Sequence, residues 1–161
     1  MEVLRWVFMI TVVWCFLVPG CVSQVVEPSG PDEAAYLEEV DATPTIFNIP
    51  KSEKDAYWER ANSFVMRFSS MKIMSVSDRV IQTFKPYIGD SGAMATDWEY
   101  GYYITYTPGA GDSGSIAVVC IYPEDVGWGK KDQAAKEATR NAKMCAYYIL
   151  TGKVYQKFIH Y

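Results

Sequence analysis

The sequence is poor in the residues that most enzymes use for metal binding and acid–base catalysis. Its 161 residues contain one histidine, His160, and four cysteines, and these lack the ligand spacing of a zinc site. No glycine-rich phosphate-binding motif precedes a predicted helix. We therefore expect no metal, no cofactor and no enzymatic activity.

Two short stretches nevertheless need an explanation. Gly89-Asp90-Ser91-Gly92 and Gly111-Asp112-Ser113-Gly114 look like the nucleophile signature of chymotrypsin-like serine proteases. A triad of that kind needs a histidine base beside the serine, and the only histidine is the penultimate residue. Because Gly, Asp and Ser are also common turn residues, we expect turns at both stretches.

A long hydrophobic run is missing as well. The most apolar stretch, residues 6–18, suits the core of a signal peptide and is shorter than the about 20 residues that a membrane-spanning helix needs. It ends at Val18-Pro19-Gly20-Cys21, which resembles the lipobox of bacterial lipoproteins. The resemblance implies that residues 1–20 are a signal peptide and that Cys21 is acylated.

This resemblance also implies a location. A lipidated Cys21 would hold the protein in the bacterial cell envelope, facing the periplasm, and Val22 after it favours the outer membrane. Two alternatives stay open: a secretory signal cut after Ser23, and an uncleaved anchor that extends to Val26.

Basic residues are absent from residues 22–50, where six acidic side chains and four prolines occur. Prolines resist helix formation and like charges repel, so we expect residues 21–51 to form an extended, lipidated tether. It is either a stalk or a plain linker, with at most a short helical turn at 34–40. The net charge of the whole chain, −4, disfavours nucleic-acid binding.

The remaining residues, 52–161, have the patterns of one α+β domain. Apolar residues recur at helical spacing over 57–68, and a second, alanine-rich helix is predicted over roughly 131–151. Alternation predicts a strand over 98–107, then a glycine-rich hairpin loop and a returning strand over 115–122. We expect an antiparallel sheet of three to four strands in α-β-β-β-α order, with two helices packed on one face.

Residues 71–84 are rich in β-branched residues, but their alternation changes phase. Met74, Val76 and Val80 share one parity, whereas Ile73 and Ile81 share the other. Because a half-buried strand buries only one parity, two interpretations remain. Either a bend at 77–79 separates two short strands, or a single strand contains a bulge.

Two cysteines remain in the domain. Cys120 shares the parity of the apolar residues of its strand, and Cys145 lies on the apolar face of the second helix. An exported compartment is oxidising, so we predict a Cys120–Cys145 disulfide. The alternative is two buried free thiols.

Aromatic residues supply the candidate partner contacts. In the strand over 98–107, Tyr100, Tyr102 and Tyr106 share one side and Tyr103 takes the other. Tyrosine is enriched at protein interfaces, although it also packs in cores. Trp128 lies between two glycines in a loop, where it either contacts a partner or folds back onto the sheet.

The stretch from Arg140 to Gly152, RNAKMCAYYILTG, resembles small uncharacterised bacterial lipoproteins of α+β type. The resemblance brings no activity with it. The domain size, the tether and the missing catalytic residues favour a membrane-anchored, non-enzymatic adaptor, assembly factor or inhibitor that contacts another envelope protein. The alternative is a binding module for a small apolar ligand or a cell-wall fragment that uses an aromatic sheet face.

Overall fold

The computed structural model describes residues 31–87, 99–127 and 129–155. Within them the chain forms one antiparallel sheet of five strands and three α-helices, so the α+β class is confirmed. The three to four strands and two helices that we expected are joined by one further strand and one further helix. The elements are α2 (Pro31–Ala42), β1 (Ile46–Pro50), a 3-10 turn (Lys51–Glu53), α3 (Lys54–Phe68), β2 (Ile73–Val76), β3 (Val80–Thr83), β4 (Gly101–Pro108), β5 (Ser113–Ile121) and α4 (Lys131–Thr151).

The sheet is built around the β4–β5 hairpin. The strand order is β1-β5-β4-β3-β2, and every pair of neighbours is antiparallel. The hairpin register pairs Gly101 with Ile121 at its open end and Pro108 with Gly114 beside the turn. β1 adds to the outer side of β5, so a segment that precedes both long helices completes the sheet.

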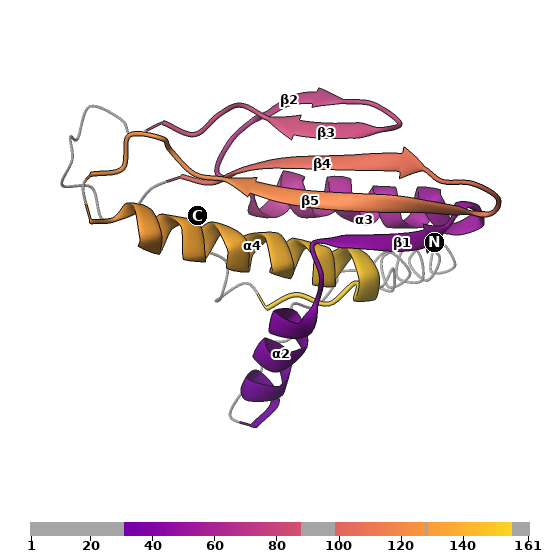
Figure 1. Cartoon of the computed structure of the whole chain (residues 1–161), viewed down its shortest axis with the longest axis horizontal. Helices are drawn as coiled ribbons and strands as arrows, with labels where there is room; N and C mark the ends of the chain where they lie inside the picture. The colour runs from indigo at the N-terminus through magenta and orange to yellow at the C-terminus, as the bar shows by residue number, and fades with distance from the viewer. Residues whose placement is uncertain (1–30, 88–98, 128, 156–161) are drawn as a thin grey trace, which may run out of the picture.

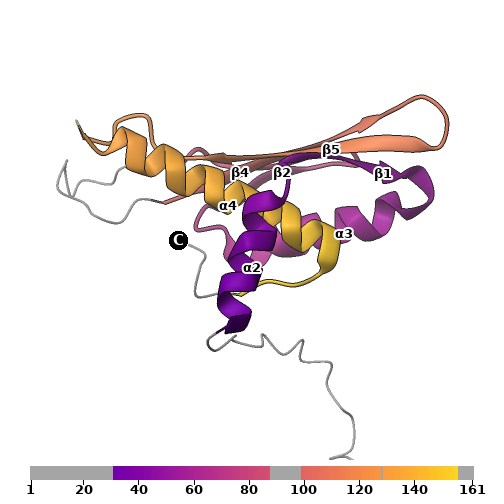
Figure 2. The ribbon, with the colours of Figure 1, turned by 60° about the horizontal axis from the view of Figure 1, so that its bottom comes forward.

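Helices α3 and α4 cover the same face of the sheet. Figures 1 and 2 show them side by side below the strands, with α2 projecting away from α4. The core fills the layer between helices and sheet, where the ring of Phe64 in α3 lies 5.6 Å from that of Tyr102 in β4, centroid to centroid. No described element covers the opposite face.

The two long helices follow their sequence patterns closely. α3 buries the predicted apolar residues from Ala61 to Phe68, and α4 has the predicted bounds. The buried alanines of α4 are small, which allows close approach to the sheet. The helix ends at Gly152, whose φ of 75° is easily adopted only by a residue without a side chain, and whose N–H donates to the Tyr148 carbonyl at 2.7 Å.

The phase change in residues 71–84 reflects two short strands separated by a bend. The Ser77 N–H donates to the Val80 carbonyl at 2.8 Å and closes the turn between β2 and β3. The register of β2 is also irregular between Ile73 and Ser75. Trp58 of α3 donates its indole N–H to the Ser77 carbonyl at 2.9 Å and so ties this turn to the helix layer.

The prediction of an extended tether over residues 21–51 is wrong for the part that the structure describes. α2 docks against α4 through buried Tyr36 and Val40, and β1 buries Phe47 and Ile49 against the helix layer. The folded domain therefore begins well before the predicted boundary at residue 52. Residues 21–30 lie outside the described residues.

The prolines that suggested a linker mark the ends of an edge strand instead. Pro44 precedes β1 and Pro50 ends it. The N–H of Lys51, next to Pro50, donates to the Asp112 carbonyl, so the backbone at position 50 points to the outer side of the sheet. A missing N–H at such an edge position breaks no hydrogen bond of the ladder.

Candidate functional site

Three of the tyrosines predicted to contact a partner are core residues. Tyr100, Tyr102 and Tyr106 are buried beneath α3 and α4, and the Tyr100 hydroxyl donates to a Glu137 carboxylate oxygen at 2.6 Å. The prediction is wrong for these three, because the helices cover the side of β4 on which they lie. Tyr103, which points the other way, is 37% exposed and stays a candidate. Trp128 lies outside the described residues.

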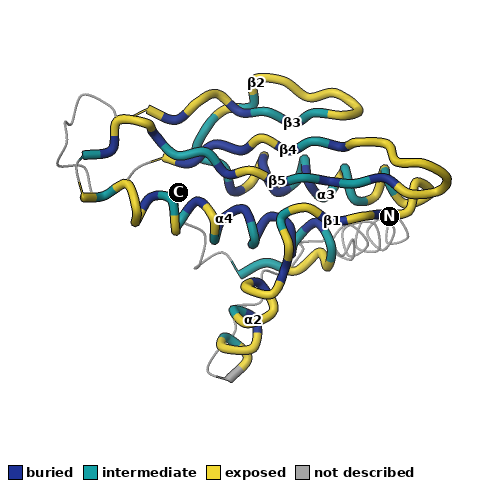
Figure 3. The backbone as a smooth tube through the Cα atoms, viewed as in Figure 1, coloured by how far each residue is buried: buried dark blue, intermediate teal, exposed yellow. Residues whose placement is uncertain are grey.

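The face of the sheet opposite the helices is here called the open face. Its residues follow from the pairing of the strands and from the alternation of burial along each strand, which Figure 3 shows in colour. Ile46 is 67% exposed and Val119 is 50% exposed. The open face of β1, β3, β4 and β5 presents Ile46, Asn48, Val80, Gln82, Tyr103, Thr105, Thr107, Ser115, Ala117, Val119 and Ile121.

None of these open-face residues carries a charge. A sheet face in contact with water usually presents polar and charged residues opposite a hydrophobic inner face. Here the outward positions of β5 become apolar toward the C-terminal end of the strand, at Ala117, Val119 and Ile121. The open face is therefore uncharged and partly apolar, and it includes the exposed aliphatic side chains of Ile46 and Val119.

The sequence contains a signal for this surface that was not part of the prediction. In the strand predicted over 115–122, the residues opposite in parity to Cys120 are all uncharged. The prediction rested instead on the tyrosines of the neighbouring strand, whose shared parity reflects the core. Ile46 could not have been assigned to the open face in this way, because residues 21–51 were predicted to form a tether.

The Gly111–Gly114 stretch forms part of the β4–β5 hairpin, as we expected of turn residues. Gly111 has a φ of 63°, and Ser113 begins β5 with its hydroxyl donating to the Ala110 carbonyl at 3.3 Å. Gly89–Gly92 and His160 lie outside the described residues.

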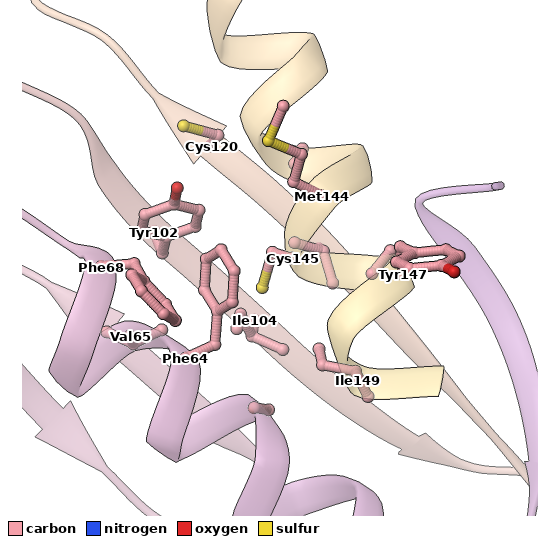
Figure 4. Close-up of a cluster of buried hydrophobic side chains, with 14 of the residues drawn as sticks. Phe64, Val65, Phe68, Tyr102, Ile104, Cys120, Met144, Cys145, Tyr147 and Ile149 are labelled. Carbon is pink, nitrogen blue, oxygen red and sulfur yellow. The ribbon is translucent and has the colours of Figure 1, made fainter. Parts of the chain in front are cut away.

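The predicted disulfide is absent from the structure. Cys120 of β5 and Cys145 of α4 are both buried free thiols, which was the alternative interpretation. Both side chains enter the core as the parity argument predicted, but Figure 4 shows their sulfur atoms well apart. The Cys120 thiol instead interacts with the Tyr102 hydroxyl and the Asn141 side chain.

Burial keeps these groups protonated at neutral pH. Desolvation raises the pKa of the Cys120 thiol to about 12, although the neighbouring Tyr102 hydroxyl and Asn141 side chain act in the opposite direction. Burial likewise raises the pKa of Cys145 well above its ordinary value, as it does for Tyr102. Both thiols are therefore protonated near neutral pH, whereas the thiolate is the reactive form of cysteine.

A shallow cleft lies where β5 leads into α4. It has a volume of about 530 Å³ and is lined by Val119, Cys120, Ile121, Tyr122, Glu124 and Lys131. A neighbouring depression of about 340 Å³ shares part of this lining and extends to Lys85, which forms an ion pair with Glu124 at 3.7 Å. The cleft adjoins the apolar end of the open face through Val119 and Ile121.

Within the described ranges, no three His, Cys, Asp or Glu side chains gather closely enough to hold a metal ion. None of the helices in those ranges has both the length and the apolar character of a membrane span.

Comparison with known proteins identifies no relative. The chain matches no protein-family model, no curated protein and no solved structure.

Proposed function

We propose that this chain is a non-enzymatic binding protein that docks another protein on its open face. The observation that carries the proposal is the absence of charge from the outward positions of β1, β3, β4 and β5. Charged residues are depleted at the centre of protein interfaces, because burying an unpaired charge is costly. A protein whose helices cover only one face of its sheet, and whose other face is uncharged, is suited to this role.

The partner that fits the open face is itself flat and uncharged at its centre. Tyr103 offers an amphipathic ring on β4, and Val119 on the neighbouring strand β5 and Ile46 on β1 beyond it offer exposed aliphatic groups. Tyrosine is common among the residues that contribute most to binding at interfaces. The threonines and serines of the same face can form hydrogen bonds at the rim.

The alternative function, binding of a small apolar ligand or a cell-wall fragment, requires an exposed aromatic sheet face. The described residues provide no such face. The aromatic side of β4 is instead the packed core between sheet and helices, where Tyr102 and Phe64 are fully buried. The cleft at the end of β5 has a mixed polar and apolar lining with a single aromatic residue, Tyr122.

Attachment to the bacterial envelope through an acylated Cys21 is part of the proposal. It rests on the Val18-Pro19-Gly20-Cys21 sequence alone, since these residues lie outside those that the structure describes. Intact mass of the detergent-extracted protein tests it. Acylation predicts a chain that begins at Cys21 with the added mass of acyl groups, whereas a bare chain that begins at Gln24 would contradict it.

Site-specific photocrosslinking tests the binding role. A photoreactive amino acid replaces Val119 on the open face and, as the matched control, Thr139 on the exposed side of α4. We expect position 119 to give one discrete protein adduct in intact cells and position 139 to give none. Absence of adducts from position 119 and also from positions 46 and 103 would overturn the proposal.

A further inference from the structure

The edge of β5 is only partly covered by β1. The β1–β5 ladder runs from the pair Pro50–Ser113 to the pair Ile46–Ala117, and one more bond follows, from the Val118 N–H to the Thr45 carbonyl at 2.8 Å. β1 ends there because the chain turns away toward α2, whereas β5 continues to Ile121. Figure 1 shows β1 beside only part of the length of β5.

The direction of the backbone groups in this uncovered part can be derived from the bonds on either side of it. In an antiparallel ladder, alternate residues of a strand direct both their N–H and their C=O to the same neighbour. The Asp112 carbonyl and the Val118 N–H both bond to the β1 side. Cys120, two residues beyond Val118, therefore directs its N–H and C=O to the side where no described strand lies.

The cleft at the end of β5 lies along this same stretch of edge. Its lining includes Val119, Cys120 and Ile121, together with Lys131, the first residue of α4. Glu124 of the cleft is paired with Lys85. Lys131 is exposed and forms no ion pair with any described residue, so its ammonium group is available to a carboxylate of a bound segment.

We propose that the edge of β5 at Cys120 binds an extended peptide segment of a partner protein that carries an acidic residue. The segment would add to the sheet in line with β1, exchanging two backbone hydrogen bonds with Cys120 and placing a carboxylate near Lys131. Pairing of an incoming strand with an exposed sheet edge is a common mode of peptide recognition. This site uses backbone groups at the edge of the sheet, whereas the proposed function uses the outward side chains of the sheet, and the two sites meet at Val119 and Ile121.

Hydrogen exchange of the full chain in mild detergent, read by mass spectrometry at single-residue resolution, tests the edge itself. Without peptide, the Cys120 amide is expected to exchange at least roughly tenfold faster than the Val118 amide, which is bonded to Thr45. Equal protection of the two amides would overturn the proposal, since it would mean that the edge is already covered.

A synthetic peptide, acetyl-Thr-Val-Thr-Val-Glu-amide, then tests binding. At about 1 mM it is expected to slow exchange at Cys120 by roughly threefold or more. The same peptide with N-methyl groups at alternate positions cannot donate the ladder hydrogen bonds, and we expect no slowing. An equal effect of both peptides would show contact without strand pairing and would overturn the proposal.

The proposed contact between the peptide carboxylate and Lys131 has its own control. Lys131→Gln is expected to weaken binding of the glutamate peptide severalfold, and Lys136→Gln, an exposed lysine farther along α4, is expected to leave it unchanged. Equal effects of the two substitutions would contradict the proposed carboxylate contact. Because these measurements do not involve the partner captured by photocrosslinking, their failure and the failure of the proposed function can be told apart.

Discussion

Tyr103 of β4 and Val119 of β5 are direct cross-strand neighbours on the open face, and both are exposed. Directly opposed residues of an antiparallel pair have their side chains about 5 Å apart. The two therefore form a continuous amphipathic patch on β4 and β5, near the open end of the hairpin. Exposed side chains of this kind contribute little to the stability of the fold, so both are available to contact a partner.

Val119→Lys is expected to separate binding from stability. The substitution places a charge on the uncharged face directly opposite Tyr103, where a bound partner would bury it, and we expect loss of the adducts formed from a photoreactive residue at position 103. Stability should change by no more than about 0.5 kcal/mol, because the side chain is half exposed and faces away from the core. Urea unfolding, followed by circular dichroism, measures the change in the free energy of unfolding.

Thr139→Lys on the exposed side of α4 is the control for the same experiment. It adds the same charge to the protein outside the open face. If both substitutions reduced the adducts equally, the effect would come from net charge and the open face would not be the binding surface.

Local patterns in the sequence predicted those elements whose residues interact mainly within one helix or one hairpin. The bounds of α4 and the buried parity of β4 and β5 follow from periodicities of 3.6 and 2, which are properties of a single segment. The same parity predicted that Cys120 and Cys145 enter the core. The parity could not predict whether the two sulfur atoms come within bonding distance. That distance depends on how α4 is positioned along β5.

The N-terminal elements were missed because their stability is not local. Residues 31–50 are acidic and contain three prolines, a composition that alone favours an extended chain. α2 is held by contacts with α4 and with Tyr155, whose ring lies 4.3 Å from that of Tyr36, and β1 by a ladder with a strand far along the chain. Phe47 and Ile49 alternate with Ile46 and Asn48, which is a short strand pattern that the flanking prolines obscured.

The free thiols of Cys120 and Cys145 lead to a prediction about labelling. In a variant with serine at positions 15 and 21, we expect no reaction with a thiol reagent at pH 7 in the native state and reaction of both cysteines in denaturant. Burial explains the native result, since it raises the pKa of both thiols and excludes the reagent. Absence of reactive thiols after unfolding would mean that the two cysteines form a disulfide in the protein.

Gly114 of β5 is expected to tolerate no side chain. A methyl group there would lie 2.5 Å from atoms of the Tyr106 ring, which occupies the space above this glycine. We predict that Gly114→Ala lowers the free energy of unfolding by about 1–3 kcal/mol, as overpacked substitutions do. Ser115→Ala, the next residue on the open face, is expected to cost less than about 0.5 kcal/mol.

A double substitution tests the reason given for the Gly114 effect. In a Tyr106→Leu background the ring is absent, so the cost of Gly114→Ala is expected to fall toward that of the Ser115→Ala control. An undiminished cost in this background would locate the strain in the backbone of β5 and contradict the proposed clash. Thermal and urea unfolding of the four proteins in the cycle provide the measurement.

The docking of α2 on α4 is predicted to depend on pH through Tyr147. Its hydroxyl donates a hydrogen bond to the Glu39 carboxylate, and burial, followed by this bond, raises the pKa of Tyr147 to about 12. The unfolded chain releases this proton near pH 10. The stabilisation by Tyr147 is therefore fully present below pH 10 and is lost as the pH rises from 10 to 12.

Tyr147→Phe removes the hydroxyl and keeps the ring that packs edge-on against Tyr36 at 5.3 Å. At pH 7 we expect this variant to be less stable than the native sequence by about 1 kcal/mol, the usual contribution of a partly exposed hydrogen bond. The difference should shrink as the pH rises from about 10 toward 12, because the native tyrosine loses its proton on unfolding. Tyr103→Phe on the open face controls for general effects of alkaline pH, and a difference between Tyr147→Phe and the native protein that stays constant to pH 12 would contradict the role of the Tyr147–Glu39 bond.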